Sequence, residues 1–149
     1  MKETISYNIS QINEICEKIS HRISDQTIIL LNGDLGSGKT TFSRNLLEHI
    51  FSIENVTSPT FNLINEYLCD YKMKQLQVLH CDFYRITGQV PDDLWHLDEN
   101  FLVLVEWPNK VTTNWQEFCL NHNAVLITID FKQYNPNSNQ RDIIINYAK

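Results

Sequence analysis

The stretch LLNGDLGSGKTTFSRNLLEHI runs from Leu30 to Ile50 and contains the pattern G-x-x-x-x-G-K-T, formed by Gly33, Gly38, Lys39 and Thr40. A glycine loop between a buried strand and a helix can turn several backbone N–H groups toward one anion, and the helix N-terminus adds partial positive charge. Three of the four glycines of the chain lie in this stretch, where the backbone must approach phosphate without a Cβ in the way. The stretch therefore predicts a phosphate-binding loop.

The residues on both sides of the loop support this interpretation. Thr27 to Leu31 is a short apolar run rich in β-branched residues, which is typical of a strand buried on both faces of a parallel sheet. From Lys39 to Ile50 the apolar residues Phe42, Leu46 and Ile50 recur at helical spacing. Strand, loop and helix therefore follow one another in the order that a phosphate loop requires.

The residue types in the loop predict the individual contacts. Lys39 is expected to reach the β and γ phosphates of a nucleotide, and the Thr40 hydroxyl to bind Mg²⁺. Thr41 lies on the same first helical turn and is placed to donate to the α phosphate. The nucleotide-binding residues predicted from this stretch are Gly33, Gly36, Ser37, Gly38, Lys39, Thr40 and Thr41.

A carboxylate for the metal is expected at the end of a neighbouring strand. The stretch FLVLVEW, Phe101 to Trp107, delivers Glu106 at a strand's C-terminal end, where ligands gather in open α/β sheets. Glu106 is a Walker-B-like candidate, with Glu in place of the commoner Asp. The alternative is an acidic strand-end residue in solvent. Trp107 could pack near the nucleotide or in the core, and its residue type alone favours the core.

A second carboxylate, Asp82, lies in LHCDFYR. If Val78, His80 and Asp82 alternate on one face of a strand, His80 and Asp82 point to the same side. Two interpretations stay open from the residues alone. The pair could be a structural hydrogen-bonded pair capped by Arg85, or it could orient the attacking water and bind the metal through water.

The rest of the chain predicts a mixed sheet. TFNLINEYL and LQVLHCDFY have strand character, and the polar turn between them is too short for a crossover helix, so they are expected to pair antiparallel. Isoleucines at helical spacing predict a helix from Ser10 to Ile23. Strands are also expected at FLVLVEW, AVLITIDF and RDIIINY, and helices over 91–100 and 108–121. The fold class expected is α/β, a three-layer P-loop NTPase fold with a mixed, partly antiparallel central sheet, in a single domain over residues 1–149.

The composition indicates the kind of partner and the location to expect. The 149 residues are 42% hydrophobic and 20% charged, the balance of an ordinary globular protein. The net charge is −6 and no basic stripe is visible, so any role in a nucleic-acid process is expected to run through a protein partner. The longest apolar run, TIILL, is far shorter than the roughly 20 residues that cross a bilayer. No membrane contact is expected, and the lack of an apolar signal core at the N-terminus predicts a cytoplasmic location.

The cysteines do not indicate a metal centre. The four cysteines include no C-x-x-C pair, and buried or surface thiols are expected. A zinc site at Cys69, His80 and Cys81 is disfavoured, because two of these ligands are adjacent and no knuckle is present.

The motifs that the sequence lacks indicate which nucleotide and which reaction to expect. GTPases read guanine through N-K-x-D, but the nearest string, Asn109 to Thr112, has Thr in place of that Asp, and no D-x-x-G occurs. Adenine is therefore expected. Small kinases need several arginines around the transferred phosphate, and only Arg85 and Arg141 lie outside the two N-terminal helices. Hydrolysis is favoured, with a small P-loop kinase or a nucleotide-binding scaffold without turnover as the alternatives.

Four motifs together resemble one family. GDLGSGKTTF, SPTF (Ser58 to Phe61), HCDFYR and VEW are similar to the TsaE (YjeE) family of small bacterial P-loop ATPases, in the same order and over most of the chain. The resemblance implies an Mg²⁺-dependent ATPase that serves threonylcarbamoyladenosine (t6A) modification of tRNA, weak alone and stimulated by partners. It implies TsaD and TsaB as those partners, with tRNA reached only through their complex.

The resemblance also implies residue roles. Lys39 would hold phosphate, and Thr40 with Glu106 would bind Mg²⁺. Asp82 matches the essential aspartate of the H-x-D-x-Y-R string, which favours a catalytic or metal-positioning role. The chain departs from the family mildly at Ser37, Cys81 and Phe83. The catalytic residues implied are Asp82, Glu106 and Lys39, and the metal site implied is Thr40, Glu106 and Asp82. Thr60 is the implied γ-phosphate sensor. Arg141 matches a position near the adenine, and a salt bridge at the sheet edge explains it equally well.

Overall fold

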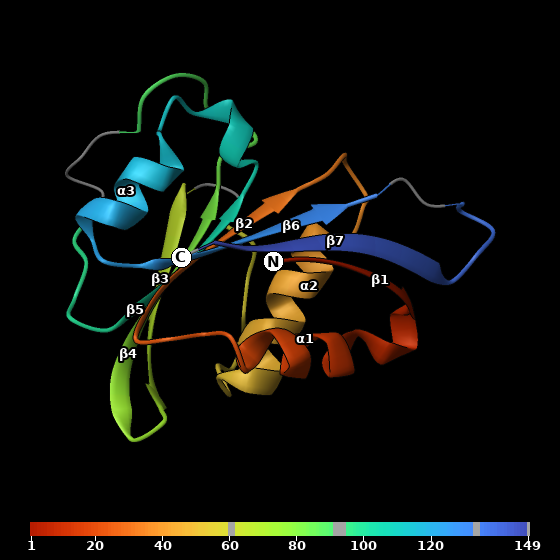
Figure 1. Cartoon of the computed structure of the whole chain (residues 1–149), viewed down its shortest axis with the longest axis horizontal. Helices are drawn as coiled ribbons and strands as arrows, with labels where there is room; N and C mark the ends of the chain where they lie inside the picture. The colour runs from red at the N-terminus through yellow and green to blue at the C-terminus, as the bar shows by residue number, and fades with distance from the viewer. Residues whose placement is uncertain (60–61, 91–94, 133–134, 149) are drawn as a thin grey trace.

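The structure, a computed structural model, describes residues 1–59, 62–90, 95–132 and 135–148. Among these residues, seven strands form one sheet with helices on both of its faces (Figure 1). The strands are β1 (Lys2–Asn8), β2 (Gln26–Asn32), β3 (Ile64–Tyr71), β4 (Lys74–Asp82), β5 (Phe101–Glu106), β6 (Val125–Phe131) and β7 (Gln140–Ala148). The helices are α1 (Ile12–Ser20), α2 (Lys39–Asn45) and α3 (Trp115–Asn121), with a π-helical turn at Leu46–Ile50 and 3-10 turns at Ile9–Gln11 and Pro108–Lys110.

The sheet has the strand order β1-β7-β6-β2-β5-β4-β3. Its centre is parallel, because β2 pairs in parallel with both β5 and β6, and β5 with β4. Its edges are antiparallel, in the pairs β3 with β4, β6 with β7, and β7 with β1. The predicted mixed sheet and the predicted antiparallel pairing of β3 with β4 are confirmed. The parallel centre brings the C-terminal ends of β2, β4 and β5 to the same edge.

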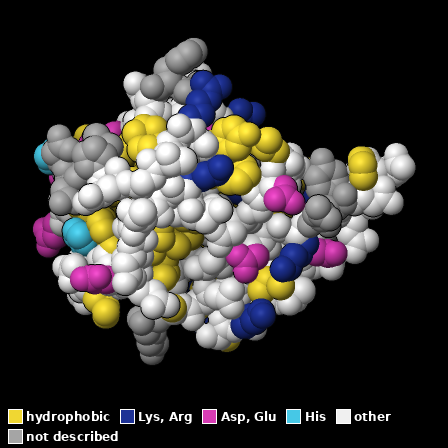
Figure 2. All heavy atoms as spheres, turned by 90° about the horizontal axis from the view of Figure 1, so that it is seen from above, with side chains coloured by type: hydrophobic (Ala, Val, Ile, Leu, Met, Phe, Trp, Pro, Cys, Tyr) yellow, Lys and Arg dark blue, Asp and Glu magenta, His cyan; other side chains and the backbone are white. Residues whose placement is uncertain are grey.

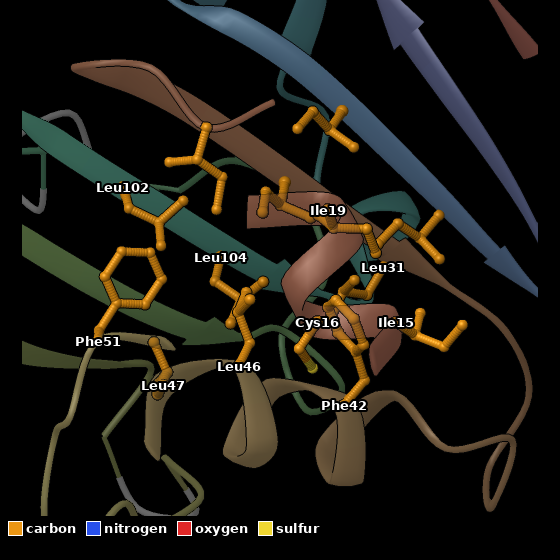
Figure 3. Close-up of a cluster of buried hydrophobic side chains, with 14 of the residues drawn as sticks. Ile15, Cys16, Ile19, Leu31, Phe42, Leu46, Leu47, Phe51, Leu102 and Leu104 are labelled. Carbon is orange, nitrogen blue, oxygen red and sulfur yellow. The ribbon is translucent and has the colours of Figure 1, made fainter. Parts of the chain in front are cut away.

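Two apolar layers hold the helices on the sheet, because side chains of the central strands alternate between its faces. In β5, Leu102 and Leu104 belong to the core that includes α1 and α2, whereas Val103 and Val105 belong to the core that includes α3. All four side chains are fully buried. The result is the predicted three-layer arrangement. Figure 3 shows the first core, where Leu102 and Leu104 lie with Ile15, Cys16, Ile19, Leu31, Phe42, Leu46, Leu47 and Phe51.

The helices on this first face follow the predicted apolar spacing. Ile15 and Ile19 of α1 are buried, and the helix is shorter than the predicted span from Ser10 to Ile23. The helix predicted after the glycine loop is α2, and its last turn widens into a π turn. Because a π turn holds an extra residue, both Leu46 and Leu47 point into the core.

The helix predicted over residues 91–100 is wrong in the part that the structure describes, and residues 91–94 lie outside that part. Residues 95–100 form no helix. The side chain of Gln77 donates to the backbone oxygen of His96 and accepts from the backbone N–H of Asp98, both at 2.8 Å. The Trp95 ring packs on Phe118, with ring centroids 5.1 Å apart. These contacts with β4 and α3 take the place of helical hydrogen bonds.

Two further differences concern the ends of elements. The helix predicted over 108–121 is two short pieces, because Asn114 is extended and its side chain caps α3 by accepting from the Glu117 N–H at 3.2 Å. The N-terminal strand β1, which the sequence did not indicate, pairs along β7 (Figure 1).

The surface carries charges of both signs. On the face seen in Figure 2, Lys and Arg side chains are interspersed with acidic and hydrophobic ones. No helix in the described part of the chain has both the length and the apolar character needed to cross a membrane.

We expect Leu104→Ala to lower the free energy of unfolding by about 2–5 kcal/mol, because it leaves a cavity between β5 and the first helical layer. Urea denaturation measures this loss. Leu120→Ala is the matched control, since Leu120 is 77% exposed, and its expected effect is below about 0.5 kcal/mol. Equal losses in the two variants would contradict the described core.

Candidate functional site: a phosphate loop and a buried carboxylate

The glycine loop connects β2 to α2 as predicted. A Cβ at Gly33 would lie 2.5 Å from Ser37 Oγ and 2.9 Å from Phe131 Cβ, so nothing larger than glycine fits there. Gly38 has φ +110°, a left-handed conformation that side-chain-bearing residues rarely adopt, and it directly precedes Lys39. The glycines therefore allow the chain to fold back closely over β6 and enter α2.

Lys39 lies buried within the loop, only 5% exposed. Its ammonium group donates to the backbone oxygens of Gly33 and Asp34 at 2.5 and 2.8 Å. Burial lowers the pKa of Lys39, and the nearby carboxylates of Glu106, Asp34 and Asp82 oppose that shift. The loop thus holds a desolvated cation on its own carbonyl groups.

Trp107 covers the other side of this cation. The Lys39 Nζ lies 4.1 Å from the centre of the Trp107 ring, within cation–π range. Trp107 has φ +60° and ψ +49°, a left-handed conformation that costs a non-glycine residue about 1–2 kcal/mol. The Tyr84 ring packs beside it at 4.9 Å. Trp107 is partly buried: it packs against the core that includes α3 and also lines a pocket with its face on Lys39.

Glu106 ends β5 with a carboxylate that is 1% exposed. The Thr40 hydroxyl donates to its Oε1 at 2.7 Å, and His80 Nε2 lies 2.6 Å from its Oε2. Both carboxylate oxygens therefore have a partner, one from the first turn of α2 and one from β4. The alternative of an acidic strand-end residue in solvent is wrong.

Asp82 lies directly opposite Glu106 in the parallel pairing of β4 and β5. Its Oδ1 accepts from the Tyr84 N–H at 3.0 Å. Burial raises the pKa of Asp82, and the Glu106 charge adds to the rise; the Tyr84 N–H, His80 and Lys39 act in the opposite direction. Since His80 pairs with Glu106, the interpretation of a hydrogen-bonded His80 and Asp82 pair capped by Arg85 does not describe these contacts.

These side chains surround one pocket of about 220 Å³ at the C-terminal edge of the sheet. Gly33 contributes its carbonyl to the Lys39 contact. Arg141 lies outside the pocket, at the start of β7, where its guanidinium donates to the Ser138 oxygen at 2.9 Å. Thr60 lies outside the described residues. The pocket is lined by Leu35, Gly36, Ser37, Gly38, Lys39, Thr40, Thr41, Asp82, Tyr84, Glu106 and Trp107.

Sequence reasoning missed two of the lining residues, Leu35 and Tyr84, and for Trp107 it favoured the core over a place near the nucleotide. A usable signal was present, because Tyr84 follows Asp82 closely and Trp107 follows Glu106 directly. Residues just beyond the ends of adjacent parallel strands meet at one edge of the sheet. In the described residues, no group of three or more His, Cys, Asp or Glu side chains could hold a metal ion by itself.

Three features define a P-loop NTPase fold: a buried parallel strand, a glycine loop closing on a lysine, and a hydrogen bond from the first turn of the following helix to a glutamate at the end of the neighbouring strand. The model of the TsaE family, described as threonylcarbamoyl adenosine biosynthesis protein TsaE, matches residues 6–143, and the chain belongs to this family.

Relatives agree with this assignment, and a solved structure shares the fold. The tRNA threonylcarbamoyladenosine biosynthesis protein TsaE of Rickettsia felis is 32% identical over 67% of this chain and 58% of its own length. The protein of the same name from Rickettsia prowazekii is 36% identical over 59% of this chain and 61% of its own length. The match thus spans less than two thirds of either relative. The crystal structure of Bacillus subtilis YdiB, 22% identical, shares the fold with a TM-score of 0.66 over 100% of this chain and 88% of its own.

We expect Asp82→Asn to raise the melting temperature near pH 7 in metal-free buffer by up to a few degrees. The Asp82 pKa is higher in the folded protein than its ordinary value of 3.8, so folding favours the protonated carboxyl. Stability is therefore lost as the pH rises through the raised pKa, and an amide removes that loss. The gain is expected to shrink toward pH 4.

Calorimetry across this pH range measures the effect. Asp70→Asn, at an exposed carboxylate of β3, is the control and is expected to change the melting temperature less. A destabilised Asp82→Asn variant near neutral pH would contradict the described environment of Asp82.

Proposed function

We propose that this protein binds ATP and hydrolyses it in the biosynthesis of t6A in tRNA. The observation that carries the proposal is the Thr40–Glu106 hydrogen bond at the mouth of the glycine loop, in a chain of the TsaE family. A threonine hydroxyl and a carboxylate held together beside a phosphate loop suit a nucleotide with its metal.

The phosphates are proposed to bind over Gly36 to Thr41, the part of the loop that lines the pocket. Backbone N–H groups at the start of α2 would donate to them, together with the helix dipole. Lys39 would exchange the carbonyl groups of Gly33 and Asp34 for β and γ phosphate oxygens. A phosphate is a stronger acceptor than a neutral carbonyl, so this exchange supports binding. The predicted contact of Arg141 with the adenine, and that of Thr60 with the γ phosphate, remain part of this proposal.

The donor set fits Mg²⁺, which prefers oxygen ligands and keeps several waters. Thr40 supplies a hydroxyl, and Glu106 and Asp82 supply carboxylates within the same pocket. The ion would neutralise charge on the phosphates during hydrolysis. Glu106 already accepts a hydrogen bond from Thr40, so these two side chains together would bind the metal ion. Asp82 is more accessible and, with its raised pKa, is proposed to orient the attacking water or a metal-bound water.

The proposed partners are TsaD and TsaB, with tRNA reached only through their complex. The net charge of −6 supports an indirect role, because direct tRNA binding would require a basic surface. Hydrolysis by the isolated chain is expected to be slow and to increase with these partners. The proposed location is the cytoplasm.

We expect Lys39→Ala to weaken ADP binding about 10- to 100-fold, because a charge-assisted contact with phosphate is lost. Titration with a fluorescent ADP analogue measures the affinity. Lys110→Ala is the matched control, since Lys110 also lies near the Trp107 ring, at 5.7 Å, but outside the loop, and it should bind nearly as the native protein does. An unchanged affinity in Lys39→Ala would show that the nucleotide binds elsewhere.

We expect reconstitution with TsaD, TsaB, tRNA and ATP to yield more than one t6A per complex only when this chain is added. Asp82→Ala should bind ATP yet fail to support repeated turnover. Full support by Asp82→Ala would favour the scaffold without turnover, and a phosphorylated small molecule in place of free phosphate would favour a kinase. ATP hydrolysis that is indifferent to TsaD and TsaB would contradict the proposed partnership.

A further inference from the structure

His80 is a buried polar residue to which the loop and metal chemistry assign no role. Its side chain is 1% exposed and shares the face of β4 that carries Asp82. Nε2 lies 2.6 Å from Glu106 Oε2. The other ring nitrogen, Nδ1, is enclosed and has no hydrogen-bond partner among the described residues. These surroundings constrain which ring nitrogen of His80 carries the hydrogen.

The direction of the His80–Glu106 hydrogen bond follows from these surroundings. A hydrogen on the enclosed Nδ1 would be a buried donor without an acceptor, which costs about 1–3 kcal/mol. A carboxylate can only accept. We therefore assign the ring hydrogen to Nε2, so that His80 donates to Glu106.

The Glu106 carboxylate then accepts one hydrogen bond on each oxygen. Thr40 donates to Oε1 from α2, and His80 donates to Oε2 from β4. Because the two donors come from different elements, together they restrict rotation of the carboxylate about its last side-chain torsion.

We propose that His80 is a positioning residue that orients Glu106 for the Mg²⁺ of the bound nucleotide; this rests on the proposed function. Loss of the His80 donor leaves Glu106 Oε2 buried and unsatisfied, and the carboxylate rotates away from Thr40 to find another partner. Residues that orient metal-binding side chains typically contribute about 10- to 100-fold to metal affinity. His80 acts on the metal and not on the phosphates, because among the described residues its side chain hydrogen-bonds to Glu106 and not to the loop or Lys39.

The competing explanation is that His80 only fills space above the first core. Both explanations predict a loss of stability on truncation. Only the positioning role predicts that metal affinity falls while nucleotide affinity stays the same. Only that role predicts that another hydrogen-bond donor at position 80 restores the metal affinity. His80→Leu removes the donor at similar volume. His80→Gln places an amide N–H where Nε2 lies and keeps the donor.

The experiment measures two affinities in native protein, His80→Leu, His80→Gln and a control. ADP binding in the presence of a chelator reports the loop alone. Mn²⁺ binding to the protein–ADP complex, followed by electron paramagnetic resonance, reports the metal site, because Mn²⁺ takes the same oxygen ligands as Mg²⁺. The control is Gln77→Leu, which removes another buried polar side chain from β4, one that hydrogen-bonds to Glu66, His96 and Asp98 and not to Glu106.

We expect all four proteins to bind ADP alike without metal. Mn²⁺ affinity should fall about 10- to 100-fold in His80→Leu, return most of the way in His80→Gln, and stay at the native value in Gln77→Leu. Native Mn²⁺ affinity in His80→Leu, or an equal loss in His80→Leu and Gln77→Leu, would overturn the role of His80. Absence of metal binding by the native protein–ADP complex would instead overturn the proposed function.

Discussion

The buried carboxylate of Glu106 constrains the whole site. An unpaired charge at 1% exposure would be prohibitively costly, so folding must deliver donors to both of its oxygens. Thr40 arrives with α2 and His80 with β4, which means that the glycine loop, two parallel strands and a helix all have to be in register. A slip of one residue between β4 and β5 would turn His80 to the opposite face of the sheet and leave the carboxylate without this partner. The parallel centre of the sheet and the two apolar layers are what keep that register.

Opposite this carboxylate, the loop holds the Lys39 ammonium group on partners that a bound phosphate would replace. Lys39 lies on the carbonyl groups of Gly33 and Asp34 beneath the Trp107 ring, and burial lowers its pKa. A phosphate would compete with those carbonyl groups for the same ammonium group, and the desolvated pocket would strengthen the new contact. The left-handed backbone of Trp107 and the burial that raises the pKa of Asp82 also cost folding free energy at this site. Such costs cluster where ligands bind.

The sequence predicts those parts whose signal is local. Thr27 to Leu31, FLVLVEW and the glycine loop carry their own pattern, and the structure has strand, strand and loop there. Strand β1 was missed because few of its residues are apolar and an edge strand needs only a partner, which β7 supplies. The non-helical path of residues 95–100 depends on Gln77, which is distant in sequence. The pairing of His80 with Glu106 instead of Asp82 likewise depends on the neighbouring strand β5. Alternation along β4 predicts the face on which His80 lies, but it does not predict the hydrogen-bond partner.

A crystal structure of the protein with ADP and Mg²⁺ tests the central claim most directly. We expect the phosphates to lie over Gly36 to Thr41 and Lys39 to have left the carbonyl groups of Gly33 and Asp34 for phosphate oxygens. The cation should lie beside Thr40, with Glu106 still hydrogen-bonded to His80. A nucleotide bound away from this loop, or bound in it with Lys39 still on those carbonyl groups, would show that the loop does not hold the phosphates in this way.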